Sequence, residues 1–299
     1  MLRSKKIMVL VSMLLVLSLG LIGCGGNQAA EEQDDAAKGT VKIVYVEWAC
    51  ATASSHVMAD ILENKMGYDV ELTAVSLPLM YKALANKDAD AMTTLWLPNT
   101  NADQMEKVKG QVEDLGPNCE GAQLGLVVPN YVTINSIEEL NENKDKFNAE
   151  IIGIDPGSAI MNITERVVKD YNLEYELMEG SDAMMAAALK NAIDKKEWAV
   201  VTGWAPHWMF ARWDLKMLED PKNILGEEEH INTLVRLGLK DDMPEVYELF
   251  DNFQWTLKDI GSAMLLDLQD DMNSKEAAHK WVQENEELVN SWLPEEYKN

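Results

Sequence analysis

Three short apolar runs, each ending in a tryptophan, constrain the fold of this chain more than any other feature. In the clearest, a β-branched run ends in Thr-Gly and then Trp204, and Pro206 follows to stop regular structure. Equivalent runs end in Trp48 and in Trp96, the latter with the same Trp-x-Pro exit. Each run predicts a buried strand that delivers an indole from its carboxyl end.

These three indoles are expected to gather at one site. Ligands of open α/β sheets bind beyond the carboxyl ends of strands, so three indoles at three such ends can form one aromatic box. Indole faces are electron-rich and favour a cation, which predicts a cage for a quaternary ammonium group. The alternative is three separate core tryptophans. It stays open for any one of them alone, and the threefold repetition favours the cage.

An internal repeat indicates how the box is built. The segment LMYKALAN at residues 79–86 matches MMAAALKN at residues 184–191, and Trp96-Leu-Pro matches Trp204-Ala-Pro. Alternating strand and helix patterns accompany both copies, which predicts an α/β fold of two similar lobes with a ligand cleft between them. The first lobe would then supply Trp48 and Trp96, and the second Trp204.

The order of these patterns along the sequence predicts the domain boundaries. They are a signal peptide at residues 1–23, a flexible tether at 24–40, a first lobe at 41–126 to which residues 236–299 return, and a second lobe at 127–235 that includes the crossover strands. Helices are expected at residues 54–66 and 182–195, a strand at 124–129, and a helix opened by the capping-box sequence that starts at Ser136.

The N-terminus has the pattern of an export signal. Arg3, Lys5 and Lys6 precede an apolar run, which ends directly before Cys24 in the sequence LIGC. This sequence resembles a bacterial lipobox, in which the cysteine is acylated, and predicts an extracytoplasmic protein anchored to the outer face of the cell membrane through Cys24. The alternatives are a plain signal peptide and an uncleaved anchor.

The charge of the chain restricts its partners. The sequence carries 51 acidic and 26 basic side chains, a formal net charge of −25. This argues against nucleic acid, whose phosphates attract basic surfaces, and against an anion drawn in by a long-range field. A cation or a net-neutral zwitterion fits better. Solubility beside a membrane is the alternative explanation of the acidity.

A zwitterion also needs donors for its anionic end. Gly157, Ser158, Ala159 and Ile160 lie where a strand-end turn is expected to enter a helix. Backbone N–H groups at such a helix start lack partners and suit a carboxylate. The alternative is an ordinary strand-to-helix turn.

Two further cysteines leave two possibilities open. Outside the cytoplasm Cys50 and Cys119 could form a disulfide bridge, which would brace the loop that carries Trp48. They could equally be two separate reduced thiols that pack as small buried residues.

Signs of catalysis are few. The chain has no nucleophile elbow, zinc-protease motif, phosphate loop or metal-ligand cluster, and its four histidines are scattered. His207 is the histidine expected near the site, where it would brace the loop or contact the ligand. Cys50 and His56 could be drawn as a nucleophile and base, but their spacing matches no motif. The sequence therefore predicts a binding protein without enzymatic activity, cofactor or metal.

The mature chain resembles the substrate-binding lipoproteins of ATP-driven importers of glycine betaine and proline betaine. The resemblance rests on YVEW ending at Trp48, the segments at residues 91–99 and 151–157, GLVVP at 125–129 and residues 200–210. It implies a two-lobe, type II periplasmic-binding-protein fold and partnership with the permease subunits of an ABC transporter. It also implies that Trp48, Trp96 and Trp204 surround a trimethylammonium group, while the amides of Ala159 and Ile160 hold the carboxylate.

One position departs from the family pattern. The family places a histidine beside the cage, five residues after the tryptophan that corresponds to Trp96, and Asn101 stands there in this chain. Asparagine can still donate a neutral hydrogen bond from its amide but carries no charge. Carnitine, choline or a sulfonium analogue therefore stand beside glycine betaine as possible ligands. A receptor domain that senses a quaternary amine for a signalling partner is the alternative function.

Overall fold

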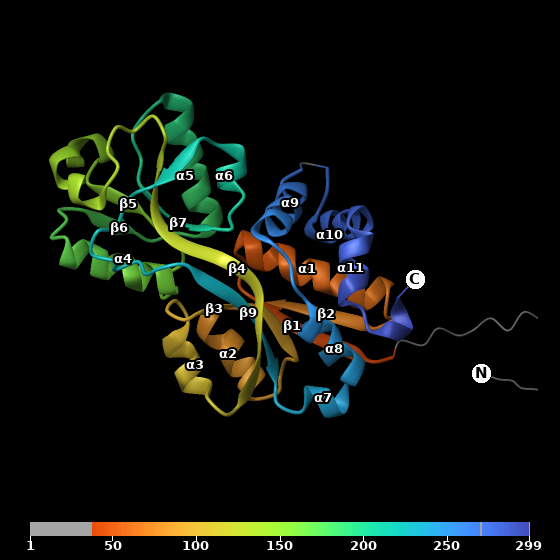
Figure 1. Cartoon of the computed structure of the whole chain (residues 1–299). Helices are drawn as coiled ribbons and strands as arrows, with labels where there is room; N and C mark the ends of the chain where they lie inside the picture. The colour runs from red at the N-terminus through yellow and green to blue at the C-terminus, as the bar shows by residue number, and fades with distance from the viewer. Residues whose placement is uncertain (1–37, 270, 299) are drawn as a thin grey trace, which may run out of the picture. The chain divides into compact units, whose positions relative to one another are not determined.

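The strands form two sheets that share one long strand. The computed structural model describes residues 38–269 and 271–298. The strands are β1 (Thr40–Tyr45), β2 (Asp69–Ala74), β3 (Ala91–Leu97), β4 (Val112–Pro129), β5 (Glu150–Ile152), β6 (Glu176–Met178), β7 (Val201–Ala205), β8 (Leu215–Met217) and β9 (Glu229–Arg236). They hydrogen-bond in the order β2-β1-β3-β9-β4-β7-β5-β6, with β8 paired to β4. Figure 1 shows β4 passing from one sheet into the other.

Helices cover both sheets. The α-helices are α1 (Ala49–Asn64), α2 (Leu77–Ala85), α3 (Ala102–Val108), α4 (Ala159–Asp170), α5 (Asp182–Lys195), α6 (Met209–Arg212), α7 (Leu239–Asp242), α8 (Pro244–Asn252), α9 (Leu257–Asp267), α10 (Ser274–Glu284) and α11 (Glu286–Trp292). The 3-10 helices are η1 (Ile137–Glu139), η2 (Asn141–Phe147) and η3 (Glu295–Tyr297). Helix α1 packs on β1–β3 and against α9 and α10, whereas α4 and α5 contact β7.

The internal repeat corresponds to a repeated topology. In sheet A, β1 lies between β2 and β3, and pairs parallel with both. In sheet B, β5 lies between β6 and β7, again in parallel pairs. Helices α2 and α5, which contain the matched sequences, lead into β3 and β7, the strands that contain Trp96 and Trp204. The mixed α/β, two-lobe fold expected from the sequence is therefore confirmed.

Strand β4 is much longer than the segment 124–129 expected from the sequence. Its first part pairs with β9 in sheet A, and its part from Gln123 onward pairs with β7 in sheet B. Gly116 and Gly121 have φ of 91° and 86°, and the register with β9 shifts around them. These glycines mark turns in an isolated sequence, but here they form irregularities within a continuing strand. All of β9 belongs to sheet A, and β4 changes its partner from β9 to β7 between Ala122 and Gln123.

Two helix starts also differ from expectation. Helix α1 begins at Ala49 and not at Ser54, although its N-cap residue Trp48 makes no side-chain capping hydrogen bond. Its cap comes from far along the chain, because the Ala49 N–H donates to Asp182 at 2.9 Å. The capping box of Ser136 and Glu139 forms as expected but opens the 3-10 helix η1. Helix α5 has the bounds expected.

Candidate functional site

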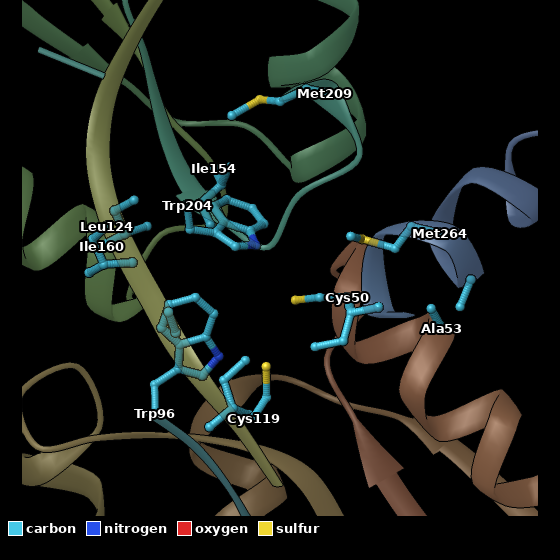
Figure 2. Packing of buried hydrophobic residues seen from close by; sticks show 14 of the residues in the cluster. Cys50, Ala53, Trp96, Cys119, Leu124, Ile154, Ile160, Trp204, Met209 and Met264 are labelled. Carbon is cyan, nitrogen blue, oxygen red and sulfur yellow. The ribbon is translucent and has the colours of Figure 1, made fainter. Parts of the chain in front are cut away.

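A small cavity lies where the carboxyl ends of β3 and β7 meet the starts of α1 and α4. The space between its lining residues, part of which is open to solvent, amounts to about 390 Å³. It is lined by Trp48, Cys50, Trp96, Thr100, Asn101, Leu124, Ile154, Ser158, Ala159, Ile160 and Trp204. Figure 2 shows the indoles of Trp96 and Trp204 on opposite sides of one open space, with Leu124 and Ile160 along one flank. The structure therefore brings together all three tryptophans singled out in the sequence.

Trp48 reaches this cavity as a half-buried side chain. Its ring centroid lies 6.5 Å from that of Trp204, at an interplanar angle of 58°. Its indole N–H donates to a carboxylate oxygen of Asp155 at 3.2 Å. The indole is thus attached by its edge to the turn before α4, which leaves its face available to the cavity.

Asn101 links the loop after β3 to the backbone of Trp96. Its Oδ1 accepts from the Trp96 backbone N–H at 2.8 Å, and its own backbone N–H donates to the Trp96 carbonyl at 2.9 Å. The side chain is buried, at 2% exposure, and lines the cavity. Because Oδ1 is occupied by the backbone, the side-chain N–H₂ group is the part left for a ligand.

The start of α4 supplies further donors. Ala159 and Ile160 are the first two residues of the helix, where backbone N–H groups have no acceptor within the helix. Ser158 is only 3% exposed, and its hydroxyl neither caps the helix nor meets another partner among the described residues. A buried hydroxyl without a partner costs stability, which is recovered when a ligand satisfies it. Gly157 lies outside this inner cavity and lines the wider cleft beside it.

His207 does not line the cavity, and of the two roles expected for it, brace or ligand contact, its hydrogen bonds are those of a brace. Its Nδ1 accepts from the Met209 N–H at 3.1 Å, and its Nε2 lies 2.9 Å from a carboxylate oxygen of Asp182. The ring packs edge-to-face on Trp204, with centroids 4.7 Å apart. His207 braces the loop after β7 because both of its nitrogens are occupied by the protein.

Cys50 and Cys119 are both buried, free thiols in the structure. Burial raises the pKa of the Cys50 thiol to about 12, and it raises the pKa of Cys119 to about 12 as well. The thiolate is the reactive form, so neither cysteine is activated as a nucleophile. No hydrogen bond joins Cys50 to His56 among the residues described, and burial lowers the pKa of His56.

The thiols are therefore expected to react slowly while the protein is folded. In a titration with a thiol-specific chromogenic reagent near pH 8, the native protein should show almost no reaction at Cys50 or Cys119. Both should react fully in denaturant, where the pKa returns to about 8.5. A Cys24→Ser variant is the suitable background, and rapid native labelling of either residue would contradict this prediction.

Four residues that line the cavity were not identified from the sequence. Cys50 and Thr100 are small residues beside two of the tryptophans, while Leu124 and Ile154 belong to apolar strand ends. Nothing in the sequence context of Leu124 and Ile154 distinguishes them from core residues. Proximity to Trp48 and Trp96 was the signal that could have identified the first two.

Two helix-covered β-sheets line an aromatic cavity that has hydrogen-bond donors along one side. This is the architecture of a solute-binding protein. Residues 39–284 match the family model described as the substrate-binding domain of the ABC-type glycine betaine transport system. The chain belongs to this family.

Individual relatives agree with this assignment. A glycine betaine/carnitine transport binding protein of Listeria monocytogenes, GbuC, is 44% identical over 151 residues, which is 50% of this chain and half the length of that relative. The lactococcal protein OpuAC, crystallised closed with glycine betaine, has 40% identity and a TM-score of 0.81, and the match covers 86% of this chain and 100% of that one. A choline-binding protein in complex with choline has 27% identity and a TM-score of 0.77, covering 85% and 91%.

The predicted signal peptide, Cys24 and the tether up to residue 37 lie outside the described residues. Within the described part of the chain, no helix is both long enough and apolar enough to cross a membrane.

Proposed function

We propose that this chain captures glycine betaine, or a closely related quaternary ammonium compound, and delivers it to the permease subunits of an ABC importer. The observation that carries this proposal is the convergence of Trp48, Trp96 and Trp204 on one cavity. A trimethylammonium group is weakly hydrated and gains from contact with indole faces in a desolvated site. Members of this family are substrate-binding proteins, so the three indoles are assigned to binding and not to catalysis.

The other side of the cavity supports a zwitterionic ligand. The amides of Ala159 and Ile160 and the hydroxyl of Ser158 are donors without an assigned acceptor. A carboxylate there would receive hydrogen bonds at a helix start, where the helix dipole favours negative charge. A ligand with a cationic head and a carboxylate a few bonds away matches both sides. Choline, which lacks the carboxylate, would leave these donors unused.

Isothermal titration of the purified chain with glycine betaine, carnitine and choline tests the proposal. Glycine betaine should bind and outrank choline. Absence of binding by all three compounds would overturn it. The family relationship gives no support to the alternative function as a receptor for a signalling partner.

Asn101 gives a sharper test of the carboxylate contact. Asn101→Asp keeps an oxygen that can accept from the Trp96 N–H but replaces the side-chain donor by a negative charge. Loss of a hydrogen bond to a charged group costs about 1.5–3 kcal/mol, so glycine betaine should bind at least tenfold more weakly. Choline affinity should hold or rise, because the new carboxylate faces a cation.

Asn101→His is the complementary variant. An imidazole can accept from Trp96 through one nitrogen and donate to the ligand through the other, so glycine betaine binding should be kept or tightened. Calorimetric titration of the parent and both variants with the two ligands decides the matter. Equal losses for glycine betaine and choline would show that Asn101 acts only as a brace of its loop.

Substrate-binding proteins of ABC importers work outside the cytoplasm, and for this chain we propose attachment to the outer face of the membrane through acylated Cys24. The support is the lipobox-like sequence that ends at this residue. A Cys24→Ser variant that remained with the membrane fraction would contradict it.

A further inference from the structure

The carboxylate of Asp182 joins the two halves of the chain beside the cavity. Asp182 is the first residue of α5, on the sheet B side, and is 6% exposed. One oxygen accepts from the Ala49 N–H, at the start of α1 on the sheet A side, at 2.9 Å. The other oxygen lies 2.9 Å from Nε2 of His207. The cap of α5 itself is provided by Ser181, whose hydroxyl accepts from Met184, so Asp182 is not needed for that purpose.

His207 orients this carboxylate as a neutral imidazole. Its Nδ1 accepts from the Met209 N–H and therefore carries no proton, so the ring proton lies on Nε2 and is donated to Asp182. Both nitrogens of the ring and both oxygens of the carboxylate are thereby used. The carboxylate charge then faces the N-terminus of the 16-residue helix α1, where the helix dipole stabilises it.

The contact also positions a wall of the cage. Trp48 immediately precedes Ala49, and its indole N–H donates to Asp155, a second carboxylate from the sheet B side. Two carboxylates of one half thus hold the backbone after Trp48 and the edge of its ring. Asp182 does not line the inner cavity, so it acts on the ligand only through Trp48 and the closure of the two halves.

We propose that Asp182, oriented by His207, is a positioning residue that latches the half carrying α1 and Trp48 onto the half carrying Trp204, and so retains the bound ligand. This rests on the proposed function for its effect on binding, but the latch itself is a contact between protein groups. Opening the cleft must break the hydrogen bond to Ala49, and it must expose a carboxylate that is buried when closed. The latch therefore opposes ligand release more than ligand entry.

Asp182→Asn tests the latch with little change in shape. The asparagine side chain has one oxygen, which can accept from either Ala49 or His207. Its N–H₂ group then faces the remaining donor, and that hydrogen bond is lost. Stopped-flow tryptophan fluorescence should show dissociation accelerated on the order of tenfold to a hundredfold, with the association rate nearly unchanged. The factor should be the same for glycine betaine and choline, because the latch touches neither. Asp194→Asn, on the exposed face of the same helix, is the matched control and should dissociate like the parent.

Two results would overturn the latch. One is an unchanged dissociation rate in Asp182→Asn. The other is a loss confined to glycine betaine, which would make Asp182 part of the carboxylate site. Small-angle X-ray scattering tests the latch without a ligand. The Asp182→Asn variant should have a larger radius of gyration than the parent. Identical scattering profiles would refute the latch even if the parent bound none of the compounds. Failure of the parent to bind would instead overturn the proposed function.

Discussion

Trp48→Ala is expected to weaken glycine betaine binding by about tenfold or more while leaving the fold intact. Each indole face in a desolvated cage contributes roughly 0.5–2 kcal/mol of cation–π attraction, and truncation also removes apolar contact with the methyl groups. Trp48 is the cleanest of the three positions because its side chain is only half-buried. Trp96 and Trp204 are 5% and 4% exposed, so their truncation should weaken binding similarly but also lower stability.

Fluorescence or calorimetric titration checks this result, with the melting temperature of the ligand-free protein measured in parallel. Trp48→Phe is the matched control, because it keeps an aromatic face with a weaker attraction for cations and should fall between the parent and the alanine variant. The affinity for choline should fall as well, since the cage acts on the ammonium group. Parent-like affinity in the alanine variants of all three tryptophans would contradict the cage.

Trp292→Ala should have the opposite profile, with a large loss of stability and little change in affinity. Trp292 is 1% exposed and lies in an aromatic cluster far along the chain from the cage. Its ring is stacked on Trp281 at 6.2 Å and meets Phe253 edge-to-face at 4.9 Å. Its indole N–H donates to the Gln254 carbonyl at 2.8 Å.

Truncating a large buried aromatic residue leaves a cavity, so the free energy of unfolding should fall by about 3–5 kcal/mol. Denaturant unfolding followed by circular dichroism measures this loss, and titration below the melting temperature measures the affinity. Trp292→Phe, which retains most of the packing, should lose clearly less. Weakened binding without destabilisation would assign Trp292 to the ligand site and contradict the separation between cage and core tryptophans.

The local pattern of the sequence was sufficient for the elements on which the cage depends. Short apolar runs predicted the strands that end at Trp96 and Trp204, and the repeat predicted that both follow equivalent helices. The helical pattern at residues 182–195 predicted the bounds of α5, and the cap of that helix, Ser181, is the adjacent residue. These signals succeed because strand propensity, helix periodicity and local caps depend on residues a few positions apart.

The tertiary structure decided the rest, for a physical reason that differs from case to case. The start of α1 could not be read from sequence because Asp182, which accepts from Ala49, is 133 positions away. The length of β4 was hidden by Gly116 and Gly121, because glycines in a sequence indicate turns. In the structure both have positive φ and lie within a strand that stays paired with β9. His207 was expected either to brace its loop or to contact the ligand, and only the structure shows its nitrogens occupied by Met209 and Asp182, as in a brace. The sequence by itself determined which side chains could bind a quaternary ammonium, whereas long-range pairing determined how the two halves hold them together.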